Sequence, residues 1–197
     1  MALDLVFSGV GGQGIVVASD IFCEAALLDG WDVAKAEVHG MAQRGGSIVA
    51  HVRVGEKVQA PLIEKGKAHI ILGFEILETA RALPMLKKDG AVIVNTKYIP
   101  PSTSLVGSAK ALTHKKLLGM IRARAHTVYE VDGIGIANRL GNLVVANTVL
   151  LGALSALPEN PVNKEALEKA ISGRLKERFV DINLKAFQMG REQVSLS

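Results

Sequence analysis

The feature that most constrains the fold of this chain is an apolar segment that runs through a cluster of glycines into a helical pattern without a break. The apolar segment covers Leu3–Val10, and the helical pattern begins at Ile15. The glycines are Gly9, Gly11, Gly12 and Gly14. Glycine lets the chain turn sharply between a strand and a helix, and it lets the backbone approach a ligand closely. The helix start adds unpaired N–H groups at the positive end of the helix dipole, which favours a phosphate or carboxylate.

Apolar runs and helical periodicities alternate along the remainder of the chain. Further strands are predicted at 31–38, 47–54, 68–74, 91–95 and 127–132. Helices are predicted at 14–28, 75–86, 114–123, 133–140, 143–157, 163–175 and 177–189. This alternation predicts a single α/β domain with three layers, in which helices flank a Rossmann-like, mostly parallel sheet. The first strand, helix and second strand should form a β-α-β unit.

Length and composition agree with one globular domain and exclude several classes of protein. We expect a domain over residues 1–197, with a core at about 3–157 and C-terminal helices at about 163–189. Cys23 is the single cysteine, so the chain can hold neither an internal disulfide nor an iron–sulfur cluster, which requires several thiolates. The net charge of +4 and the aromatic content of 4% give no reason to expect a nucleic-acid partner.

The chain also shows no pattern typical of membrane insertion or export. The most apolar segment, 143–157, is too short to cross a bilayer. The first apolar run contains Asp4 and has no basic leader, unlike a signal peptide. We therefore expect no membrane partner and a cytoplasmic location. Because 143–157 is apolar on nearly all sides, it should lie in the core or against a partner subunit.

A second polar, glycine-rich loop follows the second predicted strand, at Glu37–Ser47. Within it, Arg44 offers a planar fork for a carboxylate or phosphate, and His39 adds an imidazole ring. One interpretation is a polar recognition site on a surface loop. The other is a structural salt bridge between Glu37 and Arg44, in which the neighbouring glycines only turn the chain.

We expect the first loop (Gly9–Gly14) and the second loop (Glu37–Ser47) to meet at one edge of the sheet and to receive a ligand or a partner there. The candidate binding residues are Gly9, Gly11, Gly12, Gln13, Gly14, Arg44, Gly45 and Gly46. The chain has neither a nucleophile elbow nor a Walker loop. His39, His51 and His69 form no metal set, and the last two should be hydrogen-bonded sheet residues.

The first glycine loop also allows an alternative function, that of a dinucleotide-binding enzyme. A free-standing nicotinamide- or flavin-dependent enzyme would place an acidic residue at the end of its second strand for the ribose hydroxyls. Glu37 lies near that place but leads directly into the glycine-rich second loop.

Cys23 should be a small buried hydrophobe rather than a nucleophile. Residues 90–129 contain no acidic residue, which indicates either a solvated basic surface or a docking face for an acidic partner or a phosphate-bearing cofactor.

Taken together, the two loops resemble those of a known family. They read Gly9-Val10-Gly11-Gly12-Gln13-Gly14 and Glu37-Val38-His39-Gly40-Met41-Ala42-Gln43-Arg44-Gly45-Gly46-Ser47. Residues 52–53, 61–63, 72–75 and 140–142 extend the likeness. Over about residues 3–157 the chain resembles the gamma-type subunit of 2-oxoacid:ferredoxin oxidoreductases, and it is most similar to the small (beta) subunit of the indolepyruvate enzymes. Either loop alone would be a weak signal, whereas the pair is specific.

This resemblance implies a subunit of a heteromeric complex. In the family, a large partner subunit carries thiamine diphosphate and iron–sulfur clusters. The complex oxidatively decarboxylates a 2-oxoacid to an acyl-CoA and passes electrons to ferredoxin. The resemblance implies that this chain contributes coenzyme A binding and assembly and is inactive alone. It also implies no catalytic residue here, because the chemistry belongs to the partner's cofactor. The isolated chain could form a homodimer. A pure assembly protein, whose loops bind only a partner's backbone, is a further alternative.

Overall fold

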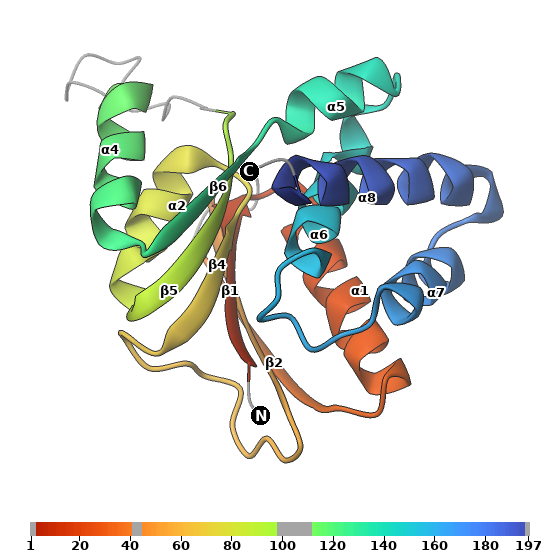
Figure 1. Ribbon diagram of the computed structural model, residues 1–197, viewed down its shortest axis with the longest axis horizontal. Helices are drawn as coiled ribbons and strands as arrows, with labels where there is room; N and C mark the ends of the chain where they lie inside the picture. The colour runs from red at the N-terminus through yellow and green to blue at the C-terminus, as the bar shows by residue number, and fades with distance from the viewer. Residues whose placement is uncertain (1–2, 41–44, 98–111, 196–197) are drawn as a thin grey trace.

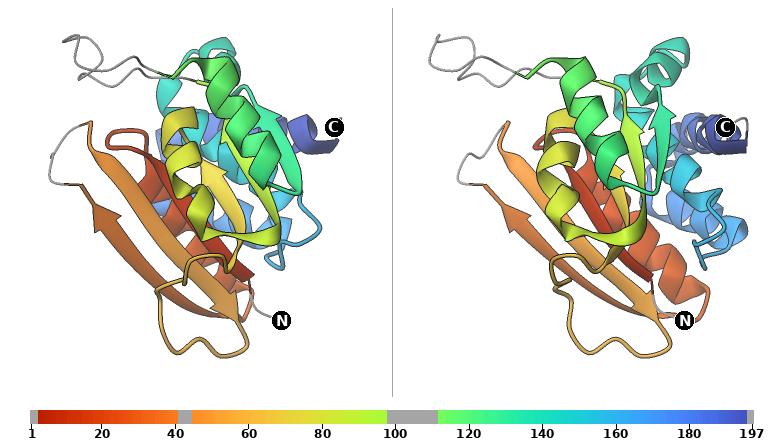
Figure 2. Two further views of the ribbon diagram at one scale, coloured as in Figure 1. Left: turned by 90° about the vertical axis from the view of Figure 1, so that its left-hand side faces the viewer. Right: turned by 60° about the vertical axis from the view of Figure 1, so that its left-hand side comes forward.

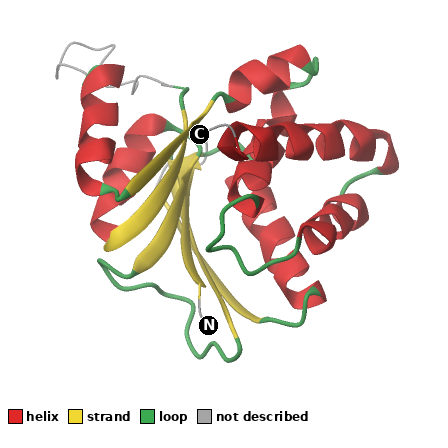
Figure 3. Cartoon of the chain, in the orientation of Figure 1, coloured by secondary structure: helices red, strands yellow, loops and turns green. Residues whose placement is uncertain are grey.

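The computed structural model describes residues 3–40, 45–97 and 112–195 (Figures 1 and 3). The strands are β1 (Leu3–Val10), β2 (Asp32–His39), β3 (Ser47–Gly55), β4 (Ala68–Gly73), β5 (Leu86–Asn95) and β6 (Thr127–Val131). The α-helices are α1 (Ile15–Leu28), α2 (Ile76–Ala82), α4 (His114–Arg124), α5 (Gly133–Arg139), α6 (Ala146–Ser155), α7 (Lys164–Arg174) and α8 (Val180–Ser195). The 3-10 helices are η1 (Leu83–Met85), η2 (Leu143–Val145) and η3 (Glu177–Phe179).

Each predicted strand and helix is present, with shifted ends. The predicted helix 75–86 is shortened, because α2 ends at Ala82 and Pro84 lies in the separate turn η1. Proline removes a backbone donor and disfavours a helix interior. As a result β5 begins at Leu86, ahead of its predicted start at 91. None of the helices in the described ranges is both long and apolar enough to span a bilayer.

The strands form one mixed sheet in the order β2-β3-β1-β4-β5-β6. β1, β4, β5 and β6 pair in parallel, whereas β3 pairs antiparallel with both β1 and β2. Strand β3 is therefore the single reversed strand, and the mostly parallel sheet of the prediction is confirmed. The predicted β-α-β unit is correct in direction, but its strands are not neighbours, since β3 lies between them. Residues 40–46 are too few for a parallel crossover, which needs a dozen or more residues, so β3 returns antiparallel.

Helices cover the two faces of the sheet unequally (Figures 1 and 2). Helices α2 and α4 pack on one face, around a core that includes Ile71, Val92, Leu117 and Ile121. Helices α1, α5, α6, α7 and α8 pack on the other face over a larger core. This arrangement confirms the three layers and shows that the C-terminal helices cover the α1 side of the sheet.

Helix α6 lies at the centre of the larger core. Its residues from Ala146 to Leu154 are all buried, so most of the apolar segment 143–157 lies in the core, one of the two expected places, whereas Leu143 and Val144 are exposed. Helix α8 crosses α6 closely because each helix presents a glycine at the contact. A Cβ at Gly152 would overlap the carbonyl oxygen of Phe187, and one at Gly190 would overlap that of Val149. Glycine is required at both positions by close backbone approach.

Candidate functional site

The first loop turns the chain from β1 into α1 by means of glycines. Gly12 has a φ of 100° and Gly14 a φ of 77°, in the left-handed region that favours glycine. Gly9 still lies in β1, where a Cβ would come within 2.7 Å of Gln13 Oε1. That oxygen accepts a hydrogen bond from the backbone N–H of Val10 at 2.8 Å. Gln13 and Gly9 therefore shape the loop, whereas Gly12 has open space where its side chain would be.

The second loop contacts the first loop directly. The backbone N–H of Gly11 donates a hydrogen bond to the carbonyl of Gly46 at 2.9 Å. A Cβ at Gly11 would also lie 3.6 Å from the backbone nitrogen of Gly45. Arg44 lies outside the described residues. The prediction that the two loops meet at one edge of the sheet is confirmed by the Gly11–Gly46 hydrogen bond.

Helix α1 begins at this edge without a capping side chain. Gly14 is the N-cap residue and offers no side chain to accept from the first turn, and the first turn holds no acidic residue. Asn147 of α6 packs on Gly14, where a Cβ would come within 2.5 Å of Asn147 Nδ2. Only glycine satisfies both the backbone angle and this contact. The uncapped N–H groups and the helix dipole together favour an anion here.

A cavity of about 480 Å³ opens beside the first turns of α1, on the face covered by α6 and α8. Its size is that of a small-molecule site. Its apolar lining comes from Val17, Ile21, Phe74, Ile134, Leu143, Val144, Val145, Ala146, Leu150, Leu175 and Phe179. Its polar lining comes from Gly12, Gln13, Gly14, Asn95, Lys97, Asn142, Asn147, Thr148 and Asn183. Leu143 and Val144 are 58% and 77% exposed, so they lie at its mouth. The cavity and the anion-favouring end of α1 are thus continuous.

Asn95, the last residue of β5, brings a buried amide to this cavity. Its side chain is 3% exposed, and Nδ2 donates to the carbonyl of Phe74 at 3.1 Å, which fixes the orientation of the amide. The Oδ1 atom of Asn95 is buried and has no hydrogen-bond partner within the described parts of the chain. A buried acceptor without a partner costs about 1–3 kcal/mol.

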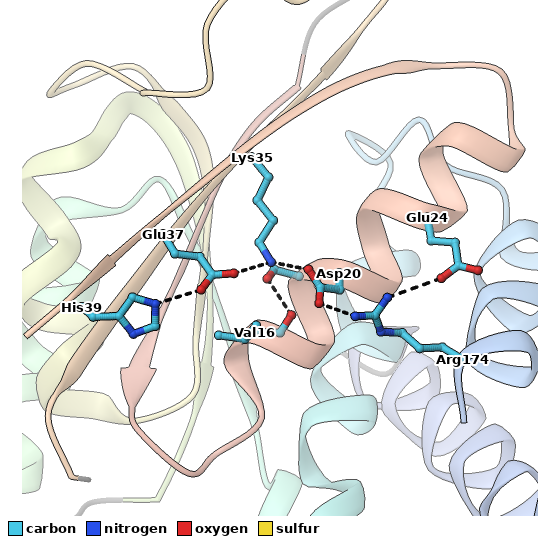
Figure 4. Close-up of polar contacts among 8 residues, drawn as sticks. Val16, Asp20, Glu24, Lys35, Glu37, His39 and Arg174 are labelled. Atoms are coloured by element: carbon cyan, nitrogen blue, oxygen red, sulfur yellow. Dashed lines mark hydrogen bonds and ion pairs between the residues drawn. The ribbon is translucent and has the colours of Figure 1, made fainter. Parts of the chain in front are cut away.

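A chain of ionic contacts connects the second loop to the C-terminal helices (Figure 4). His39 Nε2 lies 2.8 Å from Glu37 Oε2, and Glu37 Oε1 lies 2.6 Å from Lys35 Nζ. Lys35 also pairs with Asp20 of α1, and Arg174 of α7 pairs with Asp20 from the other side. Burial alone would lower the pKa of Lys35, but its hydrogen bonds to Asp20 and Glu37 outweigh burial and raise that pKa. The network joins β2, α1 and α7.

We expect Lys35→Met to lower the free energy of unfolding by about 1–2 kcal/mol, because two half-buried carboxylates then lose a charged donor. The hydrogen bond from Lys35 lowers the pKa of Glu37, against burial and with help from His39. At pH values above its ordinary pKa, ionised Glu37 therefore stabilises the fold. This contribution is lost as the pH falls through the lowered pKa of the folded state. In the variant the pKa of Glu37 should rise, and stability should depend less on pH in the acid range. Urea unfolding between pH 3 and pH 7 measures both effects.

Lys164→Met is the matched control, because Lys164 pairs with Glu168 at 3.3 Å on an exposed helix face. That pair should contribute at most about 0.5 kcal/mol. If Lys35→Met and Lys164→Met lower the free energy of unfolding equally, the Lys35 network has no structural role.

The other predicted polar residues have structural partners. His51 Nδ1 accepts from the N–H of Ile63 at 3.2 Å and His69 Nδ1 from that of Asp4 at 3.0 Å, which confirms both as hydrogen-bonded sheet residues. Burial lowers the pKa of both histidines. Among the described residues, no group of three or more His, Cys, Asp or Glu side chains is placed to hold a metal ion.

The structure divides the acid-free stretch 90–129 into parts with different roles. Arg124 donates to the backbone carbonyls of Leu86 and Lys87, so it fixes the start of β5. Lys97 lines the cavity and is exposed. Residues 98–111 lie outside the described residues. The choice between a basic surface and a docking face therefore stays open for most of this stretch.

Comparison with known proteins identifies the family. The family model described as "Pyruvate ferredoxin/flavodoxin oxidoreductase" matches residues 4–193. The chain belongs to this family. It is 40% identical to the indolepyruvate oxidoreductase subunit IorB of Archaeoglobus fulgidus over 193 residues, which cover 98% of this chain and 96% of that protein. The resemblance inferred from the two loops is thereby confirmed.

Solved structures agree with this assignment. The gamma subunit of a keto/oxoacid ferredoxin oxidoreductase from Geobacter sulfurreducens superposes with a TM-score of 0.71 at 30% identity, covering 99% of each chain. A 2-oxoglutarate:ferredoxin oxidoreductase from Magnetococcus marinus, solved with 2-oxoglutarate, coenzyme A and succinyl-CoA, gives a TM-score of 0.76 at 19% identity. The match covers all of this chain and 31% of that one, and at this identity it shows the fold alone.

Sequence reasoning missed the cavity residues of this family member. Asn95, Asn147 and Asn183 come from three separate elements, and no local pattern relates them. Two signals were present: a polar residue ends the buried strand at Asn95, and Asn147 interrupts the most apolar segment of the chain. Polar residues at such positions indicate hydrogen bonding in the interior.

Proposed function

We propose that this chain is the small subunit of an indolepyruvate-type 2-oxoacid:ferredoxin oxidoreductase in the cytoplasm. Full-length similarity to IorB carries this proposal, since 98% of the chain aligns at 40% identity. The complex would oxidatively decarboxylate an arylpyruvate, transfer the acyl group to coenzyme A and reduce ferredoxin. The large partner subunit would carry thiamine diphosphate and the iron–sulfur clusters, because Cys23 is the single thiol of this chain.

The role proposed for this chain is to hold coenzyme A rather than to perform the chemistry. The phosphates would lie at the uncapped start of α1, where Gly12 leaves room for close approach of a ligand to the backbone. Gly11, Gly14, Gly45 and Gly46 would shape this site, and Arg44 would supply a charge. The coenzyme supplies the thiol that accepts the acyl group, so no residue of this chain needs to act as a nucleophile.

The geometry disfavours a free-standing nicotinamide or flavin enzyme. Such an enzyme needs a carboxylate at the end of the second strand that is available to ribose hydroxyls. Both carboxylate oxygens of Glu37 are already engaged, one by Lys35 and the other by His39. Glu37 is thus part of the ionic network rather than a ribose ligand.

Reconstitution tests the proposal. The chain should form a stable complex with a thiamine-dependent large subunit and support the reduction of a viologen dye that depends on both an arylpyruvate and coenzyme A. Each subunit alone should be inactive. Equal turnover by the large subunit without this chain would overturn the proposal.

Charge reversal at the first loop tests the coenzyme A site. We expect Gly12→Asp to weaken coenzyme A binding by the assembled complex at least about tenfold more than Gly12→Asn, because a carboxylate repels phosphate at the helix start. Asn and Asp have the same shape and tolerate positive φ similarly. The difference in coenzyme A affinity between the two variants therefore isolates the effect of the charge. Calorimetric titration of both variants measures it.

Gly30→Asp controls for the backbone, since Gly30 has a φ of 86°, equally open space, and a position at the far end of α1. It should bind coenzyme A as the wild type does. If Gly12→Asp and Gly12→Asn bind equally, the phosphates do not lie at the start of α1.

A further inference from the structure

Strand β2 forms one edge of the sheet, and we infer that it pairs antiparallel with β2 of a second copy of this chain. A two-fold axis through Ala36 relates the two strands, so that Lys35 of one copy faces Glu37 of the other. Three observations carry this inference: the regular open edge, the order of the charges along it, and the small apolar side chains on its other face. It does not depend on the coenzyme A proposal.

The edge at β2 is long and regular. The strand covers eight residues without a proline, and within the described sheet it pairs with β3 alone. That pairing runs from Asp32–Gly55 to His39–Ile48 without a register shift. Figure 2 shows β2 along the outer margin of the sheet. Proteins usually protect such an edge with proline, a bulge or an exposed lysine, because its outward N–H and C=O groups can pair with another strand.

The lysine of β2 does not protect the edge, because its charge is neutralised within the chain. Lys35 Nζ lies 2.6 Å from Glu37 Oε1 and pairs with Asp20 as well, and the Lys35 side chain is only 17% exposed. A lysine that blocks an edge instead extends into solvent. The edge therefore remains open to a strand that carries charges in a complementary order.

The strand itself carries that complementary order. In an antiparallel pairing centred on Ala36, residues at equal distances from the axis lie opposite one another, so each Lys35 faces a Glu37. Opposite charges directly across two strands stabilise the pair, whereas like charges destabilise it. An axis at Lys35 or at Glu37 would place two like charges opposite one another. Because β2 is complementary to itself in one register, a second copy is the partner that fits a two-fold interface.

The other face of β2 allows the second copy to approach closely. Ala34, Ala36 and Val38 alternate with the charged residues along the strand. Ala36 pairs with His51, which in turn pairs with Val6 of the core beneath α2 and α4, so this row lies on the α2 side of the sheet. Val38 is 53% exposed, and both alanines are partly exposed. In the two-fold pairing Val38 lies opposite the second copy's Ala34, which buries apolar surface on both sides of the axis.

A charge on the axis tests the pairing in the full-length chain. Sedimentation of the wild type at about 100 µM should give twice the mass of one chain. Ala36→Lys should raise the dissociation constant of the dimer at least about tenfold, because two lysines then face one another across the axis. Ala36 projects away from Lys35, so this change leaves the ionic network intact. Thr127→Lys is the control, because Thr127 lies on β6 at the opposite edge of the sheet, and its dissociation constant should equal that of the wild type.

A mixture of two variants makes the test specific for the register. Ala36→Asp alone should also dimerise at least about tenfold more weakly than the wild type, for the same reason as Ala36→Lys. Mixed together, the two variants place opposite charges across the axis. They should form a heterodimer at least about tenfold more tightly than either variant pairs with itself. Loss of dimer through misfolding of a variant would not be reversed by mixing.

Hydrogen exchange provides a measurement that needs no variant. The outward backbone N–H groups of β2 should exchange more slowly at about 100 µM than at about 1 µM, because pairing protects them. The N–H groups of β6 provide the internal control and should exchange at the same rate at both concentrations.

Three results would overturn the inference: a wild type that stays monomeric at about 100 µM, a dimer that Ala36→Lys and Thr127→Lys weaken equally, and a mixture no tighter than its separate variants. If the wild type is monomeric and Ala36→Lys instead prevents assembly with the large subunit, β2 pairs with that subunit and not with a second copy. The proposed function stands in each of these cases, because turnover by the reconstituted complex decides it.

Discussion

Substitution of Gly152 by alanine should lower the free energy of unfolding by about 3 kcal/mol, because the added methyl group meets a backbone atom rather than a flexible side chain. A Cβ at this position overlaps the carbonyl oxygen of Phe187 in α8. Relief requires α8 to move away from α6, which opens the larger core. Gly190→Ala should have a similar cost for the reciprocal reason, since its Cβ overlaps the carbonyl of Val149. Urea unfolding followed by circular dichroism measures both changes.

Gly119→Ala provides the matched control for the same substitution in a helix. Gly119 lies in α4 with no atom within 4 Å of the added Cβ, so alanine meets nothing there. We expect it to raise stability by about 0.5–1 kcal/mol, the usual gain for alanine over glycine in a helix interior. If Gly152→Ala is as stable as Gly119→Ala, then α8 does not depend on close contact with α6.

The α6–α8 contact illustrates which parts of the fold could be predicted from the sequence. Periodicity located both helices, since it depends on residues a few positions apart. It could not show that Gly152 and Gly190 face one another, because that pairing depends on a crossing of helices distant in sequence. The same limit explains the placement of β3: alternation identified the strand, but the choice of β1 and β2 as its neighbours depends on tertiary packing.

The candidate site divides in the same way. The strand, glycine loop and helix at Leu3–Leu28 could be predicted because turn chemistry and helix capping are local. The meeting of Gly11 with Gly46 could be expected because a glycine loop follows each of two strands that run in the same direction. The cavity could not be predicted, since Asn95 and Asn147 reach it from separate elements. Arg44 remains a prediction, because it lies outside the described residues.

Cys23 should react with iodoacetamide at pH 8 about a thousandfold more slowly than an unperturbed thiol, because the reactive species is the thiolate. Burial raises the pKa of Cys23 from 9.0 to about 12, and the nearby charges of Lys35, Asp20 and Arg174 have smaller, partly opposing effects. At pH 8 the thiolate fraction therefore falls by about three powers of ten. Mass spectrometry of alkylated protein over time measures the rate, and the same protein in urea should react at the rate of a free thiol.

The same pKa difference predicts a loss of stability in alkaline solution. Between pH 9.0 and about 12 the folded state keeps the proton on Cys23 and the unfolded state releases it, so stability falls as pH rises. The slope from this thiol is at most about 1.4 kcal/mol per pH unit. Cys23→Ala should remove that part of the slope while leaving the contributions of lysines and tyrosines unchanged. If the stability curves of the wild type and Cys23→Ala run parallel above pH 9, the thiol ionises normally. Rapid alkylation of the folded protein at pH 8 would show the same, and it would also show that this face of α1 is open to solvent.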